Sequence, residues 1–124
     1  MRTLDLKDIC GYVPHGLKYL YEGTTIGDVR IQDYKTTIDS LLCLNFIIKP
    51  LLRPMSDLTK EITHEGERFV PTLALDKLNC FPVSDTEKAL RYYDKLNEWM
   101  FDYRNLIYAG LAIDVNTLPE NPYE

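Results

Sequence analysis

The sequence predicts an α+β fold in a single domain, for three reasons. A capping box at 84–87 precedes an apolar stripe with helical spacing, which predicts one long C-terminal helix over 84–109. Alternating, aromatic-rich residues at 17–22 and a Glu65-Gly66 turn between two short runs predict strands. Prolines and glycines cut the rest into short pieces. We therefore expect a small, mostly antiparallel sheet covered by that helix and edged by several short helices.

Length and composition set the outer limits of this fold. The chain has 124 residues, of which 45% are hydrophobic and 27% charged, close to the average of soluble globular domains. A chain of this length is enough for one hydrophobic core. We expect a single domain over 1–116 and a flexible C-terminal tail over 117–124, where two prolines fall.

No feature of the sequence predicts a membrane segment or export. The longest apolar stretch, 41–48, is interrupted by Asn45 and is far shorter than the roughly 20 residues of a spanning helix. The first residues carry acids where a secretory signal has its apolar core. Three widely spaced cysteines with apolar neighbours predict reduced core thiols. These features indicate a cytoplasmic protein.

In the first half of the chain, the pattern predicts a short helix over 5–13 and a second strand over 28–33. The segment 36–48 is apolar on both faces, which is typical of a central strand, although a buried helix fits the same residues. Pro50 and Pro54 argue against regular sheet pairing in the residues between them.

The second half is predicted as a helical turn over 57–61, a hairpin over 62–70 and a short helix over 72–78. The long helix over 84–109 then follows, and Gly110 is placed to end it. Its apolar stripe consists of Leu90, Tyr93, Leu96, Met100, Tyr103 and Ile107, widened by Trp99 and Leu106.

The charges do not favour nucleic acid as a partner. The net charge is −5, and residues 63–124 hold eleven acidic and six basic residues, whereas residues 1–62 are balanced. Nonspecific nucleic-acid binding needs clustered Lys and Arg. A nucleic-acid-associated regulator remains an alternative, and it requires four basic residues on one face: Lys18, Arg30, Lys35 and Arg53.

Two histidines are the candidates for acid–base chemistry. His15 stands in a Pro-His-Gly turn, and His64 precedes the Glu65-Gly66 turn. Either could serve a small hydrolase or nucleotide-acting enzyme if a carboxylate lay beside it in a deep pocket. An exposed histidine in a turn is the more common situation. The sequence contains no nucleophile elbow, P-loop or zinc-protease motif, so we assign no catalytic residue, metal site or cofactor.

Arg53 and Asp57 form a further candidate ligand or partner site together with the two histidines. Arg53 lies in a stiff Leu-Leu-Arg-Pro segment, from which a guanidinium could clamp an anion or a carboxylate. Its structural alternative is to bridge to Asp57 or to backbone carbonyls that the prolines leave unpaired.

The chain is also rich in aromatic residues, with nine Tyr, four Phe and one Trp. Tyrosine and tryptophan dominate the hot spots of protein interfaces. A candidate aromatic interface therefore gathers on the long helix: Tyr92, Trp99, Phe101 and Tyr103. Coverage of the sheet by the same rings is the alternative.

Four segments of the chain are similar to a known family: 4–18, 52–71, 97–103 and 110–118. The motifs are L-R-P-M-S-D-L-T-K-E-I-T-H-E-G-E-R-F-V-P and G-L-A-I-D-V-N-T-L. They resemble a family of small uncharacterised proteins encoded in phage and prophage regions of gut bacteria. The resemblance implies an accessory role in the cytoplasm of a bacterial host. It supplies no activity and no catalytic residues.

The leading functional prediction is a non-catalytic accessory module that binds another protein or a second copy of itself. The acidic, aromatic-rich second half fits this role. A membrane partner is not expected, and nucleic acid is not favoured.

Overall fold

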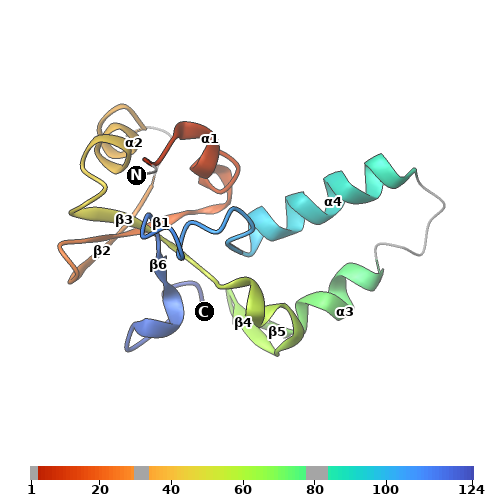
Figure 1. Cartoon of the computed structure of the whole chain (residues 1–124). Coiled ribbons are helices and arrows are strands. Elements are labelled where there is room, and N and C mark those ends of the chain that lie inside the picture. The colour runs from red at the N-terminus through yellow and green to blue at the C-terminus, as the bar shows by residue number, and fades with distance from the viewer. Residues whose placement is uncertain (1–2, 30–33, 78–83) are drawn as a thin grey trace.

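A computed structural model of the chain describes residues 3–29, 34–77 and 84–124 (Figure 1). It has the predicted α+β character. The α-helices are α1 (Leu6–Ile9), α2 (Tyr34–Cys43), α3 (Pro71–Asp76) and α4 (Asp85–Glu98). The strands are β1 (Lys18–Tyr21), β2 (Thr25–Asp28), β3 (Ile48–Leu52), β4 (Ile62–His64), β5 (Glu67–Phe69) and β6 (Ile113–Asp114). Short 3-10 turns are η1 (Val13–His15), η3 (Met55–Thr59) and η5 (Val115–Thr117).

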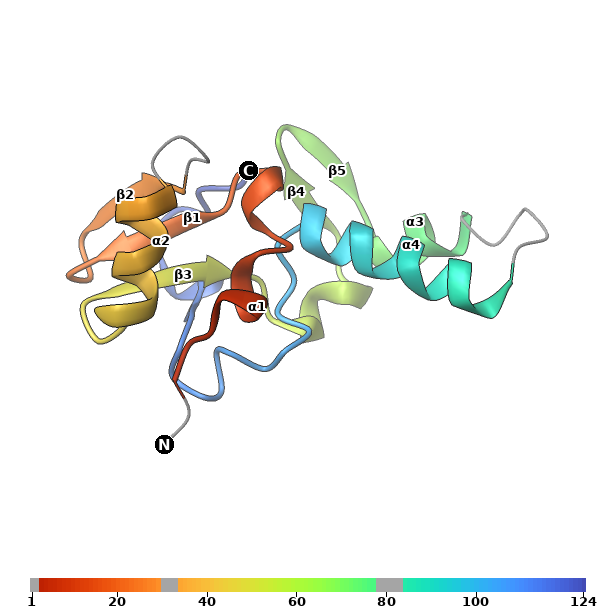
Figure 2. The same ribbon diagram turned by 90° about the horizontal axis from the view of Figure 1, so that it is seen from above.

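The main sheet is mixed, with the strand order β2-β1-β3-β6. β1 pairs antiparallel with β2 and β3, and β3 pairs parallel with β6. α1 and α2 lie to one side of this sheet, and α3 and α4 extend away from it (Figures 1 and 2). The main core includes Leu17, Leu41, Leu51 and Leu106, all 0% exposed.

Strand β3 runs through Pro50 to Leu52. The expectation that the residues between Pro50 and Pro54 lack regular sheet pairing is wrong for Leu51 and Leu52, which pair with Ile113 and Asp114 of β6. Pro50 lies opposite Tyr19 of β1, whereas the parallel pairing with β6 begins one residue later, between Leu51 and Ile113. A proline lacks the amide that a ladder bond needs. Because β6 starts beyond Pro50, the strand continues although this residue donates no bond.

The ambiguous segment 36–48 is helical in its first part. Residues up to Cys43 belong to α2, and β3 starts at Ile48. The central-strand interpretation is therefore wrong for 36–43. α2 buries Ile38 and Leu41, three residues apart, which is the spacing of one helix face. Cys43 and Cys10 are free but exposed, so they are not core thiols, and Cys80 lies outside the described residues.

Other predicted elements shift by a few residues. The strand expected over 28–33 is not found as predicted: β2 shares only Asp28 with it, Val29 is outside any strand, and residues 30–33 lie outside the described part of the structure. The turn expected over 57–61 is η3, and the helix expected over 72–78 is α3, beyond which Leu78 is not described. The short helix expected over 5–13 is α1.

The predicted hairpin is confirmed as β4 and β5. Ile62 pairs with Phe69 and His64 pairs with Glu67, so Glu65 and Gly66 form a two-residue turn. Their φ angles, 50° and 81°, are both positive, as a type I′ turn requires. Gly66 adopts this conformation freely, whereas Glu65 does so at a conformational cost.

The prediction of one long C-terminal helix over 84–109 is wrong. Its N-terminus is as predicted, because the Ser84 hydroxyl accepts a hydrogen bond from the Glu87 amide. The helix ends at Glu98, because Met100 has a positive φ of 62°. The Met100 amide bonds the Asn97 carbonyl and the Phe101 amide bonds the Leu96 carbonyl, which is the Schellman pattern of a helix end.

The segment 117–124, expected to be a flexible tail, packs against the domain through Tyr123. This side chain is 4% exposed. Its hydroxyl donates to the Leu51 carbonyl (2.7 Å) and accepts from the Lys18 amide (2.9 Å), so it joins β1 and β3. The Glu65 amide bonds the Tyr123 carbonyl (2.7 Å), which ties the same segment to the hairpin.

Candidate functional site

Arg53 stands where the main sheet meets the end of α4. It follows β3 directly and forms a parallel bridge with Phe101. Its amide donates to the Met100 carbonyl (2.7 Å), and its carbonyl accepts from the Asp102 amide (2.8 Å). The chain after α4 is therefore fixed to the end of β3, and the Arg53 side chain is held near the C-terminal end of the helix.

The Arg53 guanidinium is a buried cation that bonds three groups. Its side chain is 2% exposed. Nε donates to the Trp99 carbonyl (3.1 Å), and Nη2 donates to the Thr63 carbonyl (2.9 Å) and to His64 Nδ1 (3.2 Å). A cation at a helix C-terminus compensates the negative end of the helix dipole and bonds its last carbonyls. Arg53 therefore has a structural role, but the carbonyls it bonds are those of Trp99 and Thr63 and not ones beside the prolines.

The contact with Arg53 fixes the protonation of His64. Arginine can only donate, so His64 Nδ1 must carry no proton and the neutral ring is protonated at Nε2. The ring is 6% exposed and stacks on Tyr123, with 6.0 Å between the ring centroids. Burial lowers the pKa of His64, and the Arg53 charge lowers it further, whereas a hydrogen bond to the Glu98 backbone opposes this shift. The imidazole is therefore neutral at pH 7.

Asp57 is buried close to Arg53, but no ion pair joins the two side chains in the described structure. Asp57 lies in η3 and is 6% exposed. One carboxylate oxygen accepts from Asn116 Nδ2 (2.7 Å), and the other faces Lys60 Nζ at 3.5 Å. Burial lowers the pKa of Arg53, and the negative charges of Asp57 and Glu124 oppose this effect.

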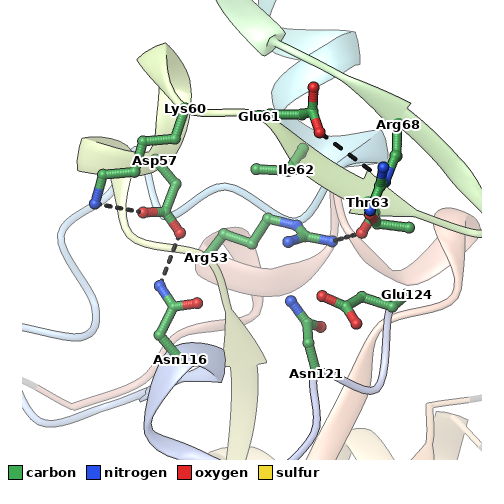
Figure 3. A pocket seen from close by; sticks show the side chains of 10 residues that line it. All are labelled: Arg53, Asp57, Lys60, Glu61, Ile62, Thr63, Arg68, Asn116, Asn121 and Glu124. Atoms are coloured by element: carbon green, nitrogen blue, oxygen red, sulfur yellow. Dashed lines mark hydrogen bonds and ion pairs between the residues drawn. The ribbon is translucent and has the colours of Figure 1, made fainter.

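A polar cleft of about 490 Å³ opens over these groups (Figure 3). It lies between η3, the β4–β5 hairpin, η5 and the segment that ends at Glu124. Figure 3 shows the Arg53 guanidinium in the middle of the ring of lining residues. These are Arg53, Asp57, Lys60, Glu61, Ile62, Thr63, Arg68, Asn116, Asn121 and Glu124. Asn116 and Asn121 were not predicted as site residues, because nothing in a polar C-terminal segment indicates that it packs beside the cleft.

The structure therefore brings together three of the four ligand-site candidates and separates the fourth. Arg53 contacts His64, and Asp57 shares the cleft with Arg53. His15 is exposed at the end of η1 and is not among the residues that line the cleft. Across the described residues, no cluster of His, Cys, Asp and Glu is suited to hold a metal ion.

Two members of the candidate aromatic interface are core residues instead. Trp99 is 7% exposed and packs on Phe69 (4.8 Å between centroids). Phe101 is 0% exposed, and its carbonyl accepts from the Tyr12 hydroxyl. Both belong to a second hydrophobic cluster that joins the hairpin to α4. The prediction that these two rings form an interface is wrong, because the chain at the end of α4 places both in the hydrophobic core.

The remaining aromatic candidates are half-buried. Tyr92 lies on α4. Tyr103 packs edge-on against the exposed Tyr93 (5.3 Å) and lies under Arg104 (5.8 Å from the guanidinium to the ring centroid). Tyr93 was expected in the apolar stripe that faces the core, but its ring lies at the surface.

Several groups that the two alternative functions would use have other contacts in the described structure. An enzyme based on His64 requires a neighbouring carboxylate, but Nδ1 of His64 is bonded to Arg53, and its ring also bonds the Glu98 backbone. A basic face for nucleic acid requires Arg53, which is buried, and Lys18, which pairs with Asp28. Arg30 and the side chain of Lys35 lie outside the described structure.

No protein-family model, no curated protein and no solved structure matches this chain. In the described part of the chain, no helix combines the length and apolar character needed to cross a bilayer. The fold and the site geometry therefore carry the functional argument.

Proposed function

We propose that this protein is a non-catalytic binding module that acts by docking a protein partner on the free part of α4. An accessory role in a phage or prophage, as the family resemblance implies, is part of this proposal. The observation that carries it is the incomplete coverage of the apolar stripe on α4.

Coverage of the stripe falls along the helix. Leu96, near the base of α4, is 8% exposed, whereas Tyr93 is 52% and Leu90 61% exposed. These residues are three apart and lie along one face of the helix. The chain covers the C-terminal part of the stripe with its own core and leaves the N-terminal part open. An exposed leucine and tyrosine on one face give a partner apolar surface to cover, and tyrosine is enriched in protein interfaces.

The position of this stripe makes it accessible. In both ribbon views, α3 and the first turns of α4 extend away from the sheet (Figures 1 and 2). Leu73 on α3 is also 61% exposed, although its neighbours Ala74 and Leu75 pack on the second hydrophobic cluster. A partner can therefore approach the free part of α4 without displacing the main core.

The charges near the stripe indicate the chemistry of the partner. Glu87 and Asp94 lie three residues before and four residues after Leu90, which places both beside it on the helix surface. Arg91 bonds Glu87 at 3.2 Å, whereas no ion pair involves Asp94 in the described residues. We infer a partner surface that is apolar at its centre and carries a basic side chain to meet Asp94.

The experiment is an affinity capture with a matched pair of variants. The tagged protein is incubated with a lysate of phage-infected gut bacteria, the source that the resemblance implies, and bound proteins are identified by mass spectrometry. We expect one stoichiometric partner with the unmodified chain and its loss with Leu90→Glu. The control Tyr108→Glu changes a residue that is 88% exposed outside α4, so it should retain the partner.

Two outcomes would contradict the proposal. Equal recovery of the partner by Leu90→Glu would place the docking surface elsewhere. Recovery of nothing but the protein itself, with a dimer in sedimentation, would favour self-association over a different protein. Circular dichroism of each variant confirms that the fold is retained, which we expect because both side chains are exposed.

A further inference from the structure

We propose that the cleft above Arg53 binds a small neutral ligand rich in hydroxyl groups, of the chemical class of a saccharide. The site is separate from the docking surface on α4. It therefore goes beyond the proposed function and can fail or succeed independently of it. The geometry of the hydrogen-bonding groups and the balance of charges point to this class.

The floor of the cleft is a buried donor with protons that the protein does not use. A guanidinium has five N–H groups. The bonds from Nε and Nη2 of Arg53 go to Trp99, Thr63 and His64. Within the described residues, no acceptor bonds Nη1 and no ion pair joins this guanidinium to a carboxylate. Because Arg53 is one of the residues that line the cleft, we infer that a ligand there would accept from Nη1.

Acceptors face this donor across the cleft. The carboxylates of Asp57 and Glu124 line it, and both act electrostatically on Arg53. In Figure 3 the Glu124 carboxylate and the Asn121 amide lie on one side of the guanidinium, with Asn116 bonded to Asp57 on another. A bound group must therefore accept from Arg53 and donate to a carboxylate.

The charges that line the cleft favour a neutral ligand. Arg53, Lys60 and Arg68 are matched by Asp57, Glu61 and Glu124. A bound anion would meet three carboxylates, and a bound cation would meet three basic groups. A neutral ligand leaves the balance undisturbed, and it forms charge-assisted hydrogen bonds with both kinds of group.

The hydroxyl group is the neutral group that best matches this alternation. Its single oxygen donates one hydrogen bond and accepts two, so it can bridge Arg53 and a carboxylate. Asn121 fits the same ligand, because its Oδ1 accepts from the Tyr123 amide (2.9 Å) and leaves Nδ2 as a donor. A peptide side chain would need an apolar pocket, but among the described lining residues Ile62 alone is aliphatic. The volume lies within the range of about 300–1,000 Å³ typical of small-molecule sites.

The test is a titration followed by ¹H–¹⁵N NMR, with methyl glycosides of glucose, galactose, mannose and N-acetylglucosamine as probes. We expect at least one glycoside to shift the side-chain amide signals of Asn116 and Asn121 in a saturable manner. Asn121→Asp keeps the acceptor for the Tyr123 amide but removes the Nδ2 donor, and Glu124→Gln removes a charged acceptor. Each should weaken binding about fivefold, as the loss of one hydrogen bond does.

The control variant Glu120→Gln changes a neighbouring exposed acid that does not line this cleft, so it should bind the glycoside like the unmodified protein. The dispersion of each spectrum reports whether the variant is folded. The proposal is overturned if no glycoside shifts the Asn116 and Asn121 signals. It is also overturned if those signals respond instead to inorganic phosphate or to a neutral tripeptide, or if Glu120→Gln weakens binding as much as Glu124→Gln.

Discussion

The Nε atom of Arg53 donates a hydrogen bond of 3.1 Å to the carbonyl oxygen of Trp99, the residue that follows the last turn of α4. The same guanidinium reaches the Thr63 carbonyl and the His64 ring in the hairpin. One buried cation therefore joins three segments: the end of β3, the end of α4 and strand β4. Its removal should affect all three at once.

We predict that Arg53→Met destabilises the protein by about 3 kcal/mol. The substitution leaves the Trp99 and Thr63 carbonyls and His64 Nδ1 without a donor in a buried position, and hydrogen bonds to charged groups contribute roughly 1.5–3 kcal/mol each, partly offset by the relief of burying a charge. Urea unfolding measures the change. Arg68→Met is the control, because that exposed side chain should contribute less than about 0.5 kcal/mol. Equal stability of the two variants would contradict the role of Arg53.

The lowered pKa of His64 predicts a pH-dependent stability. In the unfolded chain the pKa of the imidazole is about 6.5. Its pKa in the folded protein is lower, so below about pH 6.5 the unfolded state binds more protons and the free energy of unfolding falls with the pH. The contribution is fully present above the unfolded pKa and is lost as the pH falls through the folded pKa.

Urea unfolding between about pH 7.5 and pH 5 measures this dependence. We expect the decrease toward low pH to be smaller in His64→Asn than in the unmodified protein. His15→Asn should keep the full decrease, because His15 is exposed. If the slope of stability against pH is unchanged in His64→Asn, the buried neutral imidazole is not its source.

Glu65→Asn should stabilise the protein by about 0.5–1 kcal/mol. Glu65 occupies the first position of the hairpin turn with a φ of 50°, where asparagine is far better tolerated than glutamate. Its side chain is exposed, so the exchange removes no packing. Thermal unfolding measures the gain. Glu67→Asn, on the adjoining strand, should give no gain, since asparagine is disfavoured in strands. A loss of stability in Glu65→Asn would contradict the turn type.

Tyr123→Phe should destabilise the protein by about 1–3 kcal/mol. The hydroxyl bonds the Leu51 carbonyl and the Lys18 amide in a buried position, and phenylalanine leaves both groups without this partner. Burial also raises the pKa of the Tyr123 phenol, which keeps it protonated as a donor. Hydrogen exchange of the Lys18 amide should become faster. Tyr108→Phe is the control, since that ring is 88% exposed. A stability like that of the control would mean that 117–124 is not anchored.

Local signals in the sequence predicted some elements closely. The hairpin over 62–70 could be predicted because alternation and a glycine turn act over a few residues. The start of α4 was predicted for the same reason, because the bond from the Glu87 amide to Ser84 is local. Both features depend on short-range chemistry that is independent of the rest of the chain.

Features set by distant contacts could not be predicted. α4 ends at Glu98, before a methionine with a positive φ, and this Met100 bonds the backbone of Arg53, 47 residues earlier. The prediction that the helix continues to Gly110, the local stop signal, was therefore wrong. Burial of Trp99 and Phe101 follows from that turn. At the candidate site, Arg53 and His64 were chosen from local context, whereas Asn116 and Asn121 arrive by folding of the C-terminal segment.

The most direct test of the docking surface is photo-crosslinking from position 90. A photoreactive phenylalanine analogue replaces Leu90 in one sample and Tyr108 in a second, and both proteins are irradiated in the infected-cell lysate. We predict one crosslinked partner from position 90 and none from position 108. Identical products from both positions, or no product from position 90, would contradict a partner bound on the exposed stripe of α4.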